Sequence, residues 1–93
     1  MQLEISKHAK LEIDESYEYY NLQQDKLGNS FKSDIKSAID RIIKLPTLYP
    51  IVVDNIRKSI LHRFPFSIFY LIDHETIIIL SIAHHSRKPF YKI

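Results

Sequence analysis

Between residues 6 and 44, apolar positions recur every three or four residues, which is the spacing of one face of an α-helix. In the first of two such stretches, which runs to about residue 24, the shared positions are Ala9, Ile13, Tyr17 and Tyr20. In the second stretch they are Phe31, Ile35, Ala38, Ile39 and Ile42. The pattern predicts two helices whose apolar faces pack in the core. On the opposite face of the first helix, the residues expected to contact water are Glu12, Glu15 and Glu18.

Local signals mark where these helices begin and end. Ser6 can cap the first helix, because its hydroxyl can accept a hydrogen bond from a free backbone N–H. Gly28 is the only glycine of the chain and lies between the two apolar patterns, so residues 26–30 predict the corner of a helical hairpin. Pro46 is expected to end the second helix, because proline has no N–H to continue its hydrogen bonding.

The rest of the chain shows the two-residue alternation of β-strands. Leu3 and Ile5 predict a short first strand, and the period becomes two again from Ile56 to residue 63. Residues 66–72 and 76–83 are apolar on both faces, which predicts buried strands, with the second near the centre of the sheet. The order strand, helix, helix, strand, strand, strand predicts an α+β fold, in which a helical hairpin covers one face of a mostly antiparallel sheet.

Composition limits the class of protein. The 93 residues form one domain, residues 1–93, and the absence of cysteine excludes disulfides, a thiolate nucleophile and cysteine-based metal sites. The first ten residues lack the apolar core of a signal peptide. The longest strongly apolar run, residues 77–83, is far shorter than the roughly 20 residues that span a bilayer. We therefore expect a cytoplasmic protein without a membrane segment.

Charge is unevenly distributed along the chain. Residues 1–54 carry seven Lys and Arg against nine Asp and Glu, a net charge of −2, whereas residues 55–93 carry six against two, a net charge of +4. Because fields of one sign attract partners of the other, the second half is expected to face a polyanion or an acidic protein.

Side chains that exchange protons and bind anions gather after the last predicted strand, in the stretch His-His-Ser-Arg-Lys-Pro of residues 84–89. Histidine titrates near neutral pH, and a guanidinium forms paired hydrogen bonds to phosphate. Neighbours in an extended segment point to opposite faces, so His84 and His85 are not expected to hold one ligand together. The other histidines are scattered, so neither a metal site nor a cofactor is predicted.

Six stretches in this order resemble one family of proteins. They are Tyr19-Tyr20, Leu27-Gly28-Asn29-Ser30-Phe31, Pro46-Thr47-Leu48-Tyr49-Pro50, Ile56-Arg57, Phe64-Pro65-Phe66-Ser67-Ile68-Phe69-Tyr70 and His84-His85-Ser86-Arg87-Lys88-Pro89. Together they resemble the RelE/ParE superfamily of small bacterial toxins from type II toxin–antitoxin modules, which includes plasmid-stabilisation toxins. The Phe-Pro-Phe strand and the closing His-Arg-Pro pattern are more similar to the ParE branch.

The resemblance implies a toxin that is neutralised by a cognate antitoxin, whose extended segment wraps around it. ParE-like toxins poison DNA gyrase by binding, without being enzymes. In that case no residue is catalytic, and the residues expected to bind the target or its phosphates are Arg57, Lys58, Arg63, Arg87 and Lys92.

Two alternatives stay open. RelE-like toxins cut messenger RNA on the ribosome, and the resemblance then makes His85, Arg87 and Tyr91 the catalytic residues. Ser67 counts against this reading, because such nucleases carry arginine just after the aromatic residue of that strand. The second alternative is a non-toxic module that keeps only the antitoxin contact. For Arg87 itself, a structural role in pinning the tail to the sheet is as consistent with the sequence as contact with a target.

Overall fold

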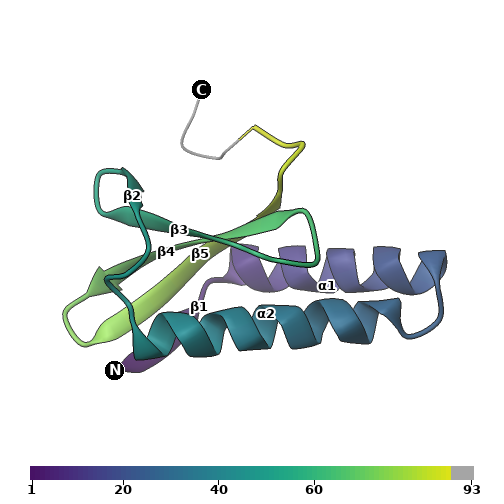
Figure 1. The fold of residues 1–93 in the computed structure, drawn as a ribbon, viewed down its shortest axis with the longest axis horizontal. Helices are drawn as coiled ribbons and strands as arrows, with labels where there is room; N and C mark the ends of the chain where they lie inside the picture. Colours follow the sequence, from purple (N-terminus) through teal and green to yellow (C-terminus); the bar gives the residue numbers. More distant parts are fainter. Residues whose placement is uncertain (89–93) are drawn as a thin grey trace.

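The computed structural model describes residues 1–88 and confirms the expected α+β fold. The elements are, in order, β1 (Gln2–Ile5), α1 (Lys7–Gln23), α2 (Leu27–Lys44), β2 (Ile51–Val53), β3 (Ile56–Ile60), β4 (Phe66–Asp73) and β5 (Thr76–His84). The two helices form a hairpin that covers one face of a single sheet (Figure 1). Strand β2 is one strand more than the sequence pattern predicted, and it is only three residues long.

The sheet has the strand order β1-β5-β4-β3-β2. Strand β1 runs parallel to β5, with Leu3 opposite Ile77, and the other neighbouring pairs are antiparallel. The β4–β5 pairing is the longest and runs from Phe66 opposite His84 to Asp73 opposite Thr76. Strand β5, which was predicted near the centre, is an inner strand next to the edge strand β1, and β4 is the central strand. The chain leaves β5 beside the start of β4.

The core lies between the hairpin and the sheet. The five apolar positions predicted for the second helix are all buried, and Phe31 and Ile42 are fully inaccessible. The sheet residues that pack against them are Phe66, Ile68, Tyr70, Ile77, Ile79 and Ile82. At one end of the core the rings of Tyr20, Phe31 and Phe64 pack together, with centroids 5.0–5.4 Å apart. Aromatic contacts of this kind fix the helices against the sheet.

The ends of the helices follow the sequence signals with one correction. Ser6 caps α1, where its Oγ accepts from the Ala9 N–H at 3.0 Å. The predicted corner at Gly28 is wrong, because Gly28 lies inside the first turn of α2. A Cβ at this position would lie 2.5 Å from the Tyr17 carbonyl oxygen, so the glycine serves the close approach of the two helices. The corner itself includes Lys26, whose φ is +66°.

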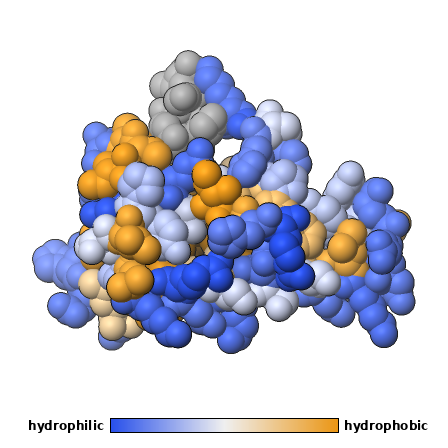
Figure 2. All heavy atoms as spheres, in the orientation of Figure 1, coloured by the Kyte–Doolittle hydropathy of each residue, from blue (hydrophilic) through white to orange (hydrophobic). Residues whose placement is uncertain are grey.

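Part of the surface is apolar. Figure 2 shows hydrophobic residues at the surface over β2 and near the connection that precedes it. In this region Leu45, Leu48 and Ile51 are each more than half exposed. Neither α1 nor α2, which are the α-helices within residues 1–88, is long and apolar enough to pass through a lipid bilayer.

Candidate functional site

The candidate site is the end of β5, where the chain turns away from the sheet. His85 N–H donates to the Pro65 carbonyl at 2.7 Å, and Arg87 N–H donates to the His84 carbonyl at 3.0 Å. These bonds hold the turn next to the start of β4. Two hollows flank it, one on the face of the sheet that the helices leave open and one between α1 and β5, and Arg87 lines both.

The first hollow, the sheet-face hollow, has a volume of about 220 Å³. Its lining residues are Lys58, Ile60, Ser67, Phe69, Ala83, His84, His85 and Arg87. Ser67 and Phe69 alternate along β4 with core residues, so their side chains point to the open face. The Ser67 hydroxyl is buried and lies 3.0 Å from His85 Nε2. The hollow thus combines two cations with an imidazole, a combination that can bind an anion.

The structure sorts the residues that were expected to bind a target. Lys58, His85 and Arg87 line the same hollow. Arg57 does not point into it, because its Nη1 donates to the carbonyls of Thr47 at 3.1 Å and Tyr49 at 2.6 Å. Tyr91 and Lys92 lie outside the described residues.

Arg63 is also engaged within the fold. Its Nε lies 3.2 Å from Asp34 Oδ1, so it links the β3–β4 connection to α2. This ion pair places Arg63 on the side of the helices, away from the sheet-face hollow.

Arg57 and Tyr70 together hold the connection between α2 and β2. The Tyr70 hydroxyl donates to the Pro46 carbonyl at 2.6 Å. Burial raises the pKa of Tyr70 to about 12, while nearby Arg57 lowers it and Tyr49 raises it. The hydroxyl therefore remains a donor over the physiological pH range, and the connection is held from two strands at once.

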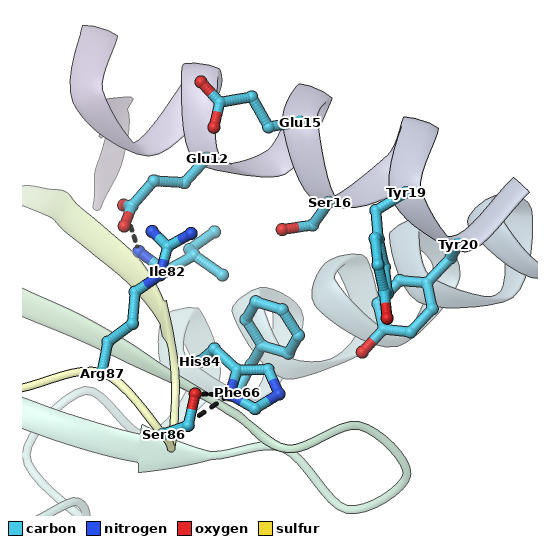
Figure 3. A pocket seen from close by; sticks show the side chains of 10 residues that line it. All are labelled: Glu12, Glu15, Ser16, Tyr19, Tyr20, Phe66, Ile82, His84, Ser86 and Arg87. Carbon is cyan, nitrogen blue, oxygen red and sulfur yellow. Dashed lines mark hydrogen bonds between the residues drawn. The ribbon is translucent and has the colours of Figure 1, made fainter. Parts of the chain in front are cut away.

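The second hollow, the α1–β5 cleft, has a volume of about 370 Å³ (Figure 3). Helix α1 forms one wall, with Glu12, Glu15, Ser16, Tyr19 and Tyr20. The end of β5, the turn after it and the start of β4 supply Phe66, Ile82, His84, Ser86 and Arg87. Burial, and to a lesser extent Tyr19, raises the pKa of Tyr20, so its hydroxyl stays protonated. One wall thus carries carboxylates and the other carries hydrogen-bond donors.

Glu12 contradicts the prediction that it contacts water. Its residue surface is only 9% exposed. Its Oε1 accepts from the Ile82 N–H at 2.8 Å and from the Ser81 hydroxyl at 2.9 Å, which joins α1 to β5. Periodicity cannot distinguish this glutamate from its exposed neighbours. The one signal in the sequence was Ser81, a polar residue within an otherwise apolar strand.

His84 offers a donor to the cleft. Its Nδ1 accepts from the Ser86 backbone N–H at 3.0 Å and lies 2.8 Å from the Ser86 hydroxyl. Because a backbone N–H can only donate, Nδ1 holds a lone pair there, and the ring proton is on Nε2. His84 contacts the Phe66 ring and His85 bonds Ser67, so the two rings have different partners, although both residues line the sheet-face hollow. Within residues 1–88, no three His, Asp or Glu side chains gather where they could hold a metal ion.

Comparison with known proteins identifies a family model and a similar solved fold. Residues 3–89 match the family model described as the ParE toxin of the type II toxin–antitoxin system parDE. Among solved structures, the chain is similar to one described as the chromosomal ParDE TA system from P. aeruginosa, with a TM-score of 0.74 and 23% sequence identity. That similarity covers 90% of this chain and 95% of the other. A comparison with curated proteins finds no match.

Proposed function

Since the chain belongs to the ParE toxin family of type II toxin–antitoxin systems, we propose that it inhibits DNA gyrase by binding and that a cognate antitoxin neutralises it. No residue of the chain performs covalent chemistry in this mechanism. The toxin attaches to gyrase through the sheet-face hollow and its two cations, Lys58 and Arg87. The antitoxin is a protein partner, and the proposed place of action is the cytoplasm.

One observation supports the sheet-face hollow as the contact surface. Lys58 and Arg87 line the same hollow, and among residues 1–88 neither has a carboxylate within 4.0 Å. Cations that the fold does not neutralise attract an acidic or phosphate-bearing partner and speed its approach. The sheet-face hollow therefore suits a partner such as a gyrase–DNA complex, which presents phosphates and protein together.

The test is pulse-labelling of DNA and protein synthesis in bacteria during the minutes after the chain is induced without an antitoxin. We expect DNA synthesis to fail first, with broken chromosomes. Lys58→Ala and Arg87→Ala should weaken this effect. Lys36→Ala is the matched control, because it removes the same charge from the exposed surface of α2 and should leave the effect intact. Protein synthesis failing first would overturn the proposal.

A second candidate function is ribosome-dependent cleavage of messenger RNA. It is favoured by the gathering of His85, Arg87 and Lys58 at one hollow, because cleavage through the 2′-hydroxyl needs a proton-transfer group and cations for the charge that builds up on phosphate. Here His85→Ala should abolish cleavage, whereas gyrase inhibition, which the proposal assigns to the charges of Lys58 and Arg87, should largely persist. Tyr91 would complete this catalytic set. If neither synthesis is affected, the chain is a non-toxic module that only binds its antitoxin.

A further inference from the structure

The sheet-face hollow has a buried serine in its floor. Ser67 of β4 lies opposite Ile60 of β3 on one side and Ala83 of β5 on the other, and all three residues line the hollow. Ser67 is only 2% exposed, so its hydroxyl needs a hydrogen-bond partner within the protein. Within residues 1–88 that partner is His85 Nε2 at 3.0 Å, and the hydroxyl has no other.

This contact favours one tautomer of His85. A neutral imidazole has one N–H and one lone pair, whereas a serine hydroxyl has a single hydrogen to donate. If the ring proton were on Nε2, the Ser67 hydrogen would have no acceptor among the described residues, which is unfavourable in a buried place. Donation from Ser67 to Nε2 avoids this cost and leaves the ring proton on Nδ1.

The His85 Nδ1–H is free to bind a ligand beside two cations. His85 is exposed, and its Nδ1 has no hydrogen bond within residues 1–88. Lys58 lies two residues before Ile60 on β3, so its side chain points to the same open face of the sheet. Together with Arg87 these residues place three donors around the hollow, and neither cation has a carboxylate within 4.0 Å in the described part of the chain.

The donors and their surroundings define the class of ligand. A phosphate group is tetrahedral and can accept hydrogen bonds from several directions, whereas a carboxylate presents its two oxygens in one plane. Apolar surface adjoins the donors, because Ile60 is 56% exposed and Lys58 Nζ lies 5.9 Å from the centre of the Phe69 ring. A nucleotide combines a phosphate with a sugar and a base that can cover such apolar surface.

We propose that the sheet-face hollow binds a phosphate group of a nucleic-acid backbone through the His85 Nδ1–H, Lys58 and Arg87, and that Ser67 holds the His85 ring in the tautomer this requires. Ser67 acts through His85 and does not touch the phosphate, so it is a positioning residue. That the phosphate belongs to DNA held by gyrase rests on the proposed function. His84, whose ring proton is on Nε2, has the opposite tautomer and provides an internal comparison.

The tautomers can be measured directly on the ¹⁵N-labelled full chain. Two-bond ¹H–¹⁵N spectra of the histidine rings, recorded at about pH 8 where histidine is mostly neutral, show which nitrogen carries the proton. We expect Nδ1–H for His85 and Nε2–H for His84. Ser67→Ala should shift His85 toward Nε2–H and leave His84 unchanged. A proton on His85 Nε2 in the unaltered chain would overturn the proposal, and this measurement needs no variant that might fail to fold.

Binding can be followed by NMR titration with four small probes. They are thymidylyl-thymidine, which carries one phosphodiester, dimethyl phosphate, which carries the same diester without nucleosides, acetyl-glutamate methylamide, which carries the same charge on a carboxylate, and thymidine, which has no phosphate. We expect thymidylyl-thymidine to shift the amide signals of Lys58, Ser67 and His85 in a saturable way and to bind more tightly than the other three. Equal binding of the glutamate derivative would indicate an acidic protein partner and would contradict the proposal. Equal binding of dimethyl phosphate would contradict its assignment to a nucleic acid.

Variants then separate the binding residue from the positioning residue. His85→Ala should weaken thymidylyl-thymidine binding about threefold, the value of one neutral hydrogen bond. Ser67→Ala should weaken it by no more than that, and in a His85→Ala chain it should cause no further loss. A further loss would mean that Ser67 acts on the fold and not through His85. Lys36→Ala, on the exposed surface of α2, is the control and should leave binding unchanged.

These results are separable from the proposed function, because the spectra and titrations involve neither gyrase nor living cells. A chain that binds thymidylyl-thymidine but leaves DNA synthesis intact keeps the phosphate site and loses the gyrase mechanism. A chain that stops DNA synthesis without binding thymidylyl-thymidine loses the phosphate site and keeps gyrase inhibition.

Discussion

The two helices of the hairpin are nearly equal in length but differ in what they bury. Helix α2 buries a continuous apolar stripe along its 18 residues. Helix α1 has 17 residues, of which only Ala9 and Glu12 are buried. Its apolar side chains Leu11 and Leu22 are more than half exposed. The helices thus contribute to the fold by different means.

This difference means that α2 contributes mainly to the core, whereas much of α1 remains at the surface. Because α2 packs by apolar area, it closes over the sheet and supplies five of its residues to the buried core. Helix α1 adds Ala9 and the partly buried Ile13 and Tyr20 to the core, and directional hydrogen bonds from Ser81 and Ile82 to Glu12 join it to β5. The α1–β5 cleft lies beside this less buried helix.

The largest effect is expected from removing the α2 core. Phe31→Ala should destabilise the chain by about 3–5 kcal/mol, because Phe31 is fully buried among Tyr20, Phe64 and Phe66. Urea unfolding followed by circular dichroism would measure it.

Two further variants make this result interpretable. Phe31→Leu, which loses less volume, provides a value if the alanine variant does not fold. On α1, Leu22→Ala removes an 86% exposed side chain and should change stability by less than about 0.5 kcal/mol. Equal losses at the two positions would contradict the division between the helices.

The next largest loss of stability is expected at Glu12, whose hydrogen bonds join α1 to β5. Glu12→Ala leaves the Ile82 N–H and the Ser81 hydroxyl without their acceptor in a buried place, which should cost about 1–3 kcal/mol. Glu12→Gln keeps an oxygen acceptor and should cost less. Glu15→Ala, on the exposed side of the same helix, is the control for losing a carboxylate. If Glu12→Ala is as stable as Glu15→Ala in urea, the hydrogen bonds of Glu12 do not stabilise the position of α1.

The contact between the helices can be tested at Gly28. An alanine there should improve helix propensity by about 1 kcal/mol. Its Cβ would nevertheless lie 2.5 Å from the Tyr17 carbonyl, so the helices would have to separate. We expect a net destabilisation of about 1–2 kcal/mol. Ser33→Ala, an exposed change in the same helix, should be neutral or slightly stabilising. A stabilising Gly28→Ala would show that the helices are not in close contact at this point.

These elements also show which parts of the structure could be predicted from the sequence. The stripe of α2 and the strands β4 and β5 were predictable because their periodicity is local and reflects burial directly. Strand β2 was missed because three residues are too few to show a period.

The site was harder to predict, because the role of each residue depends on partners that lie far away in the sequence. Arg57 and Arg63 belong to the same basic half of the sequence as Lys58 and Arg87. In the fold, however, Arg57 donates to the carbonyls of residues 47 and 49, and Arg63 forms an ion pair with Asp34. Glu12 bonds residues about 70 positions away, which no local pattern encodes.

The smallest expected change in stability concerns the N-terminal ends of the two helices. Ser6 caps α1, whereas α2 begins after Lys26, which has a φ of +66° and provides no side-chain cap. A left-handed conformation costs an L-residue about 1–2 kcal/mol, and glycine avoids this cost but loses about 0.5–1 kcal/mol through the freedom of the unfolded chain. Lys26→Gly should therefore stabilise the chain by about 0.5 kcal/mol in urea unfolding. Lys36→Gly, the same substitution inside α2, should destabilise it by about 1 kcal/mol. If both variants lose stability equally, the strain at Lys26 is not relieved by glycine, and α2 depends on its stripe alone.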